Sequence, residues 1–296
     1  FIGHADHRVS ASDTIPPMIS LDLILWLLAG LPVGLALGLT GGGGSLLAVP
    51  LLIYAFGLAP SRAVPLSLVV VSLASALGAA WVLRARQVAL RPAVVFAVPG
   101  LLTAPLGLML GARVPDVLFT TLFAAAALLV GTLMWRQATS AKAAVVRSAA
   151  GTGEGAAVCR LGGEGRLRLT PPCMLVLVCA GAVTGLLTGV LGVGGGFVIV
   201  PVLMAVTQLG IHRAVATSLV VITLISAGGA VSAIALGQLP WSLSALSFVL
   251  GGWSGMLLGR LLAQRLPAAI LQRGFSIAIA GVGLLMMLQI LTGEMS

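Results

Sequence analysis

The chain alternates between long apolar runs and short polar connections. Ten apolar segments can be recognised, five before and five after a polar stretch at residues 136–170. Most of them approach about 20 residues, the length of a membrane-crossing helix and roughly twice that of a membrane strand, so the pattern predicts helices. The segments are residues 21–40, 45–60, 63–83, 92–111 and 117–135 in the first half, and 172–191, 197–211, 214–236, 241–262 and 268–291 in the second.

Composition places these helices in lipid. The 296 residues are 59% hydrophobic and 8% charged, with a mean hydropathy of +1.17. A soluble domain carries about 25% charged residues, and in lipid a helix pairs its own backbone polar groups. We therefore predict an all-α polytopic membrane protein. Its parts are a polar N-terminal tail at residues 1–20, a first transmembrane repeat at 21–135, a cytoplasmic linker at 136–170 and a second transmembrane repeat at 171–292.

The two halves of the chain repeat each other. A shift of 151 residues places residues 29–71 on residues 180–222 without a gap, and 19 of these 43 positions are identical. The identities form an ordered set of Gly, Pro, Arg and Ser, which shared apolar composition does not produce. They include Gly41, Gly43, Gly44, Pro50, Arg62 and Ser67 in the first half, matched by Gly192, Gly194, Gly195, Pro201, Arg213 and Ser218 in the second. We interpret the chain as two homologous five-segment halves.

Basic residues indicate how the halves are oriented. The chain carries 16 Lys and Arg, and its net charge of +9 raises the question of a nucleic-acid partner. Most of these residues lie between apolar segments, however, where they set membrane orientation. With the linker in the cytoplasm, thirteen basic residues fall inside and three outside. Arg84, Arg86 and Arg91 fill one connection, whereas its counterpart around Gln238 is uncharged. This opposite bias indicates an inverted repeat, and we expect no nucleic-acid partner.

The second segment of the first half is unusually short. As a helix, residues 45–60 span about 24 Å, less than the hydrocarbon core of about 30 Å. The first two segments of each half therefore form either two full crossings or a re-entrant pair that meets at a glycine turn. Both alternatives leave every basic connection on the same side, so the charges do not decide between them.

Consecutive glycines interrupt the apolar pattern at equivalent places in the two halves. Residues 41–44 and 194–196 are all glycine, and such a run ends a helix because each Gly costs about 1 kcal/mol relative to Ala. The segment that restarts after the break presents unpaired N–H groups and the positive end of its dipole, which favour an anion. We predict a central anion site formed by Gly41, Gly43, Gly44 and Ser45 together with Gly192, Gly194, Gly195 and Gly196.

Glycines at a spacing of four have a simpler explanation. They form small-xxx-small faces on which two helices approach closely without any ligand. We expect helix packing from Gly30, Gly34 and Gly38, from Gly181, Gly185 and Gly189, and from Gly251, Gly255 and Gly259.

Prolines and hydroxyl residues extend the candidate site. Pro50 and Pro201 lie inside the short segments, where a kink is either purely structural or frees a carbonyl beside the site. Ser67, Thr217 and Ser218 either offer hydroxyls to a bound oxyanion or form hydrogen bonds between helices.

Charged residues keep to the ends of the apolar segments. Arg62 and Arg213 stand at segment starts, where we expect them to attract an anion toward each mouth without forming the site. All seven carboxylates lie at termini, at segment ends or in the linker, so none serves as a proton relay or cation site midway through a segment. No nucleophile–base or metal-ligand constellation is present in the apolar segments. We expect a protein that is not an enzyme, with no catalytic residue, metal or cofactor.

The glycine motif resembles the signature of a known family. The run from Gly34 to Gly44 followed by Val49-Pro50, and its echo from Gly185 to Gly196 followed by Val200-Pro201, are similar to the sulfite exporter TauE/SafE family of transporters. The second copy continues with Ala216-Thr217-Ser218-Leu219, which strengthens the likeness. The resemblance covers nearly the whole chain outside the tail and the linker.

This resemblance implies a secondary transporter or facilitator of small sulfur-containing anions, such as sulfite, thiosulfate or organosulfonates, in the bacterial inner membrane and commonly in export. Its partners are then the anion and membrane lipid, and a homo-oligomer is left open. The first half departs from the pattern with Pro65 and Leu66 in place of Ala216 and Thr217, so the halves need not supply hydroxyls equally. The alternative is a channel-like or scaffold component that acts with a partner subunit.

Overall fold

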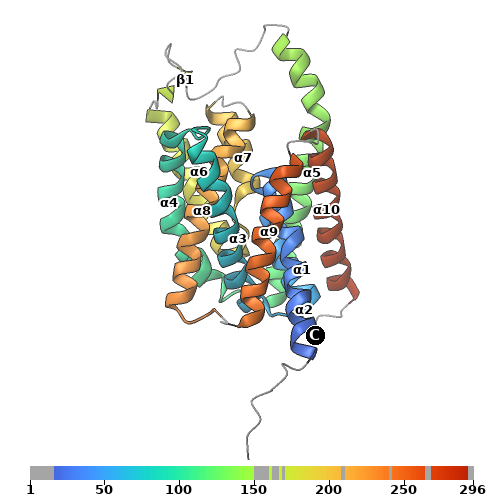
Figure 1. Cartoon of the computed structure of the whole chain (residues 1–296). Helices are drawn as coiled ribbons and strands as arrows, with labels where there is room; N and C mark the ends of the chain where they lie inside the picture. Colours follow the sequence, from blue (N-terminus) through green and yellow to red (C-terminus); the bar gives the residue numbers. More distant parts are fainter. Residues whose placement is uncertain are drawn as a thin grey trace, which may run out of the picture.

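The structure, a computed structural model, describes residues 17–149, 160–161, 167–168, 171–207, 211–239, 242–263 and 268–292. These residues form a bundle of helices (Figure 1), which confirms the predicted all-α polytopic fold. The first half comprises α1 (Pro17–Thr40), the 3₁₀ helix η1 (Gly43–Leu47), α2 (Ala48–Phe56), α3 (Pro60–Arg84), α4 (Leu90–Gly111) and α5 (Asp116–Ala149). The second comprises α6 (Pro171–Leu191), α7 (Gly196–Thr207), α8 (Ile211–Ala235), α9 (Leu243–Ala263) and α10 (Ala268–Thr292). Between the halves, β1 (Arg160–Leu161) and β2 (Leu167–Arg168) pair antiparallel.

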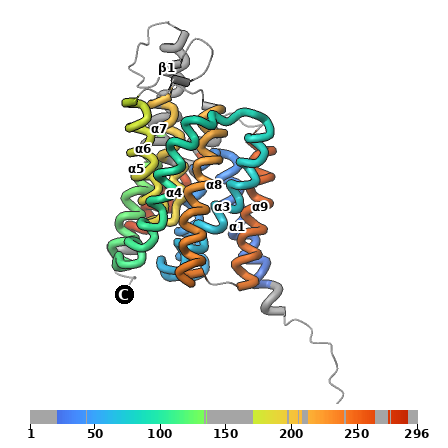
Figure 2. Tube along the Cα trace, turned by 90° about the vertical axis from the view of Figure 1, so that its left-hand side faces the viewer, coloured from blue at the N-terminus to red at the C-terminus, as the bar shows by residue number. Residues whose placement is uncertain are grey.

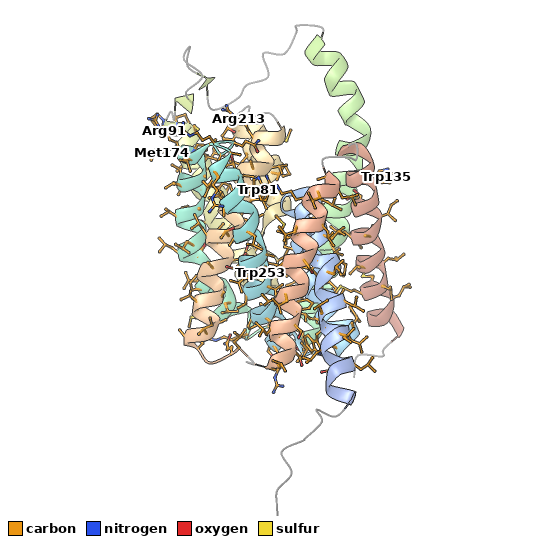
Figure 3. All side chains as sticks on the ribbon, in the orientation of Figure 1. Trp81, Arg91, Trp135, Met174, Arg213 and Trp253 are labelled. Carbon is orange, nitrogen blue, oxygen red and sulfur yellow. The ribbon has the colours of Figure 1, made fainter. Side chains whose placement is uncertain are left out.

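Six helices of the described residues are long and apolar enough to cross a membrane, namely α1, α3, α4, α6, α8 and α9. Large apolar side chains project from the outside of the bundle (Figure 3), and Leu102 and Leu175 are 67% and 64% exposed. A surface of this kind is stable against hydrocarbon and unstable against water. The chain is therefore a multi-pass membrane protein.

The helices pack mainly across the two halves. α1 lies along α9, and its counterpart in the repeat, α6, lies along α4. α3 packs on α8 within the bundle, and α5 lies beside α10 at its edge (Figure 1). α1 and α6 begin at opposite ends of the bundle, as do α3 and α8 (Figures 1 and 2). α1 and α3 thus run opposite to their repeat counterparts, which is the arrangement that an inverted repeat would have.

The spaced glycines bring two of these helix pairs into backbone contact. A Cβ atom added to Gly34 of α1 would overlap the carbonyl of Gly252 on α9. On the other side of the bundle, a Cβ atom on Gly185 of α6 would overlap the carbonyl of Gly100 on α4. Each of the nine spaced glycines singled out in the sequence, on α1, α6 and α9, faces a carbonyl of the partner helix in the same way, so their predicted packing role is confirmed.

The second element of each half is too short to cross the membrane. The predicted segment 45–60 is divided into η1, the nine-residue α2 and the first residue of α3, and α7 has twelve residues. At about 1.5 Å per residue, α2 and α7 measure roughly 14 and 18 Å, well short of a hydrocarbon core of about 30 Å. Each returns toward the end of the bundle at which α1 or α6 begins (Figures 1 and 2). Of the two alternatives, the structure shows the re-entrant pair.

The start of the predicted linker is helical. α5 continues past residue 135 to Ala149, because residues 136–149 are rich in Ala, Arg, Lys and Gln, which favour helix. Composition and charge indicated a connection there, but both are equally compatible with a solvated helix end. Most of the remaining linker and residues 1–16 of the predicted tail lie outside the described residues.

We expect the linker to be cytoplasmic and both chain ends to face outward, because the positive-inside bias places thirteen basic residues on the linker side. The measurement is labelling of intact cells with an impermeant thiol reagent. Single cysteines at positions 148 and 293 are introduced after replacement of the three native cysteines. Position 293 is expected to react and position 148 to be protected. The reverse pattern would overturn this orientation.

Candidate functional site

Two glycine turns, one from each half, are each held by a serine of the other half. Gly41 and Gly192 follow α1 and α6 with positive φ angles of 70° and 68°, the left-handed conformation that ends a helix and favours glycine. The Ser218 hydroxyl lies 2.8 Å from the Gly41 carbonyl oxygen, and the Ser67 hydroxyl lies 2.8 Å from that of Gly192. This reciprocal pairing follows the repeat and joins each turn to the opposite half.

The depth of these turns follows from the serines that hold them. Ser67 and Ser218 lie seven residues after the starts of α3 and α8, or about 10 Å along each helix, and both are fully buried. The turns therefore lie inside the bundle and not at its surface. Each serine proton is shared with a carbonyl of its own helix, Val64 for Ser67 and Val215 for Ser218. The predicted alternative of hydrogen bonding between segments is thus what both serines do in this structure.

The two turns meet in the interior. A Cβ atom on Gly42 would lie 2.9 Å from the Cα atom of Gly196, so the two backbones touch. A Cβ atom on Gly194 would lie 2.8 Å from Val71 Cγ1 and 2.9 Å from Ile222 Cγ2. Val71 and Ile222 are equivalent in the repeat, so this contact marks the centre about which the two halves are related. The structure thus brings together the two glycine runs that the sequence singled out.

The first turn satisfies its polar groups with its own side chains. The Thr40 hydroxyl accepts the N–H of Gly44 at 3.3 Å, and the buried Ser45 hydroxyl donates to the Gly42 carbonyl at 3.0 Å. The chain then passes through a single 3₁₀ turn before α2 begins. Because these groups are already paired, the first turn has less to offer a ligand than the sequence predicted. Gly43 is the first residue of η1, and its contacts are not among those described.

The second turn lacks polar side chains at the two equivalent positions. The positions equivalent to Thr40 and Ser45 are Leu191 and Gly196, which carry no polar side-chain atom. The buried Thr188 hydroxyl of α6 lies beside the turn, 2.8 Å from the position of a Cβ atom on Gly195, and donates to the Thr184 carbonyl.

α7 starts directly at Gly196. The Gly195 N–H donates to the Val193 carbonyl, and the amides of Val198 and Ile199 both donate to the Gly195 carbonyl. Gly194 and Gly196 are buried at the N-terminus of this twelve-residue helix, where helix geometry supplies no acceptor for their N–H groups.

A serine that the sequence argument missed lies beside this second turn. Ser226 of α8 is fully buried, and its hydroxyl has no hydrogen-bond partner among the described residues. Its Oγ atom lies 2.9 Å from the position that a Cβ atom on Gly194 would take. Serine in the middle of an apolar segment was the available signal, but cross-helix bonding accounts for most such residues. Only the structure shows that this hydroxyl is unpaired.

The two prolines of the predicted site occupy different positions in their helices. Pro50 is the third residue of α2, which follows the 3₁₀ helix η1 without a break, so the kink predicted there stays a prediction. Pro201 is the sixth residue of α7 and lies inside the helix, so it cannot donate to the carbonyl four residues earlier. In the second half, proline thus leaves one carbonyl of the short helix without its usual partner.

Thr217 has a structural role that explains a difference between the halves. Its hydroxyl donates to the Arg213 carbonyl at 2.6 Å and accepts the N–H of Ala89, the residue before α4, at 3.1 Å. The repeat places Leu66 opposite Thr217 and Pro240 opposite Ala89. Proline has no N–H group, so a hydroxyl at position 66 would find no amide at residue 240 of the second half to satisfy. The departure of Leu66 from the motif follows from this pairing.

Charged side chains stay at the ends of the bundle. Arg62 and Arg213 are exposed in the first turns of α3 and α8 (Arg213 is labelled in Figure 3), which start at opposite ends. Among the described side chains, the carboxylates of Asp22 and Asp116 are exposed near the starts of α1 and α5. A hollow of about 40 Å³ lies between the start of α3 and the end of α4, and Asp116 and Val64 are among its lining residues. The glycine turns therefore lie in surroundings without a buried carboxylate among the described residues.

Comparison with known proteins assigns this architecture to a family. The profile of the sulfite exporter TauE/SafE family matches residues 26–286, which span both repeats and both glycine turns. The chain belongs to this family. The membership confirms the resemblance drawn from the duplicated glycine motif, and the TauE/SafE family is one of membrane transporters, so the chain is a membrane transporter.

Individual relatives of this TauE/SafE chain agree with the family. A probable membrane transporter protein from Xylella fastidiosa strain Temecula1 is 33% identical over 272 residues, covering 89% of this chain and 94% of the relative. Shorter matches occur to probable membrane transporter proteins of Methanocaldococcus jannaschii, 47% identical over 55 residues, and Bacillus subtilis, 39% identical over 84 residues. These cover 19% and 28% of this chain, and 20% and 30% of the respective relatives. No solved structure matches the chain significantly.

Proposed function

We propose that the protein is a secondary transporter of small sulfur-containing anions, namely sulfite, thiosulfate or organosulfonates, and that it exports them across the bacterial inner membrane. The observation that carries this proposal is the buried start of α7 at the junction of the two glycine turns. The name of the family, sulfite exporter TauE/SafE, supports the substrate class and the direction.

The chemistry of the junction suits an oxyanion. Amides at the start of α7 and the positive end of its dipole attract negative charge. Glycine at residues 194–196 lets a ligand approach the backbone closely, because no Cβ atom intervenes. No buried cation lies beside this junction in the described part of the chain, and neutral donors bind an anion reversibly, as transport requires. Sulfite, thiosulfate and sulfonates all present several acceptor oxygens to such donors.

Flux through purified protein tests this function. The protein is reconstituted in liposomes and assayed with sulfite, thiosulfate, sulfate, sulfoacetate and taurine. We expect flux of at least one sulfur oxyanion above that of protein-free liposomes. A protein that carries none of them by itself would contradict the proposal and favour a channel-like or scaffold component that needs a partner subunit.

Arg62 and Arg213 are expected to act on the rate of approach and not on the bound anion. Both are exposed at the ends of the bundle, five residues or about 7.5 Å along α3 and α8 from the serines that hold the turns. Substitution of either residue by Gln is expected to slow uptake a few-fold at low ionic strength and little at high salt, because salt screens long-range attraction. Initial flux rates at several salt concentrations measure this. An unchanged salt dependence in both variants would leave them as determinants of orientation only.

A further inference from the structure

Ser226 stands out among the described residues because its buried hydroxyl has no partner. The residue is fully buried in α8, and the only other buried side-chain atom without a partner in the described part of the chain is Trp253 Nε1. An unpaired buried hydroxyl is destabilising, because it has lost its hydrogen bonds to water without replacing them. Few buried polar groups in native structures lack a partner, and a bound ion or water is one of the explanations for those that do.

The repeat shows that the unpaired state is specific to this position. The equivalent of Ser226 is Ser75 on α3, which is also fully buried. Ser75 is satisfied: its hydroxyl lies 3.1 Å from the Ser72 carbonyl, and the Thr223 hydroxyl donates to it at 3.0 Å. The same residue type at the same depth is therefore paired in one half and unpaired in the other.

The unpaired hydroxyl lies beside the second glycine turn, at the start of α7. Ser226 Oγ lies 2.9 Å from the position of a Cβ atom on Gly194. In the first half, Thr40 and Ser45 engage the turn, whereas the second half has Leu191 and Gly196 in their places. The unpaired Ser226 hydroxyl and the N-terminus of α7 therefore both lie at the backbone of Gly194. These are two independent features that favour a ligand at the same place.

We propose that Ser226 is a ligand of the transported anion: its hydroxyl donates a hydrogen bond to one oxygen while amides at the start of α7 hold the others. This inference rests on the proposed transport of sulfur oxyanions and adds a side chain to a site otherwise built of backbone. It also makes the site asymmetric. The anion binds at the second turn, and the first turn supports that turn from the opposite half.

The test is Ser226→Ala, with calorimetric binding of sulfite and thiosulfate to detergent-purified protein. Loss of one hydrogen bond to a charged ligand weakens binding by roughly 10- to 100-fold. Without ligand, thermal stability is expected to be unchanged or higher, because an unpaired buried hydroxyl is removed. The matched control is Ser232→Ala on the same helix, whose hydroxyl bonds the Gly228 carbonyl at 2.9 Å, and its affinity is expected to equal that of the parent.

The outcomes separate this inference from the function on which it rests. If the parent binds sulfite or thiosulfate and Ser226→Ala binds it equally well, the hydroxyl is not a ligand and the inference is overturned, while the proposed function stands. A parent that neither binds nor carries any of the tested anions would overturn both. Equal losses of affinity in Ser226→Ala and Ser232→Ala would show a general effect on α8 and would also overturn the inference.

Discussion

Gly194→Val protein is expected to fold and insert while binding sulfite and thiosulfate at least about 100-fold more weakly than the parent, a loss of about 2.7 kcal/mol. A Cβ atom at this position meets Val71, Ile222 and Ser226 at 2.8 to 2.9 Å. These contacts are with side-chain atoms and not with backbone, so we expect a smaller loss of stability than at a glycine that faces a partner carbonyl. The larger side chain places bulk over the backbone amides at the start of α7, where we propose that the anion binds.

The control for this substitution is Gly281→Val on α10. A Cβ atom on Gly281 would have no neighbour within 4 Å, so this variant adds the same side chain away from the turns. Binding isotherms and thermal unfolding are measured for both variants. Parent-like affinity in a folded Gly194→Val protein would contradict the glycine-turn site.

Gly34→Val is expected to lower stability by at least about 3 kcal/mol, the upper range for overpacking, so that little folded protein is recovered. Gly34 faces the Gly252 carbonyl on α9, which belongs to the backbone and cannot move aside as a side chain does. The two helices must separate along their whole contact, which joins the first half to the second. The measurement is the yield of monodisperse protein and its unfolding temperature.

Gly274→Val on α10 is the matched control for Gly34→Val, since a Cβ atom there would have no neighbour within 4 Å. We expect this protein to unfold near the parent temperature. Equal stability of the two variants would show that close approach of α1 and α9 is not required.

Much of the fold could be predicted from periodic features of the sequence. Apolar runs of helix length predicted the helical bundle, and the 151-residue repeat predicted two homologous halves. The spaced glycines indicated close helix packing, but they could not name the partner. α1 packs on α9 of the other half, and this choice depends on long-range geometry that neither spacing nor hydropathy encodes.

The candidate site was predicted in outline and differs in detail. Consecutive glycines located both turns, because a run of glycines breaks a helix whatever surrounds it. The engagement of Ser67 and Ser218 with opposite turns and the pairing of Thr217 with Ala89 depend on atoms far apart in sequence. The unpaired state of Ser226 is likewise a property of its neighbours and not of its residue type.

The difference in polar side chains between the two glycine turns was partly visible in the sequence. Thr40 and Ser45 have no polar counterparts at Leu191 and Gly196, a difference that the repeat alignment contains. Its meaning emerges only with the geometry, because the side chains of Thr40 and Ser45 turn back onto their own backbone. A polar side chain near a glycine run can therefore occupy backbone groups that would otherwise bind a ligand, and it does not always provide a ligand-binding group itself.

The most direct test of the central claim is to locate a bound anion. Selenite has the shape of sulfite and carries an anomalous scatterer, so crystals grown with selenite would reveal its position once competition with sulfite is established in solution. We predict a selenium peak at the start of α7, within hydrogen-bonding reach of Gly194, Gly196 and the Ser226 hydroxyl. A peak confined to the hollow beside Asp116 or to the exposed ends at Arg62 and Arg213 would contradict the glycine-turn site.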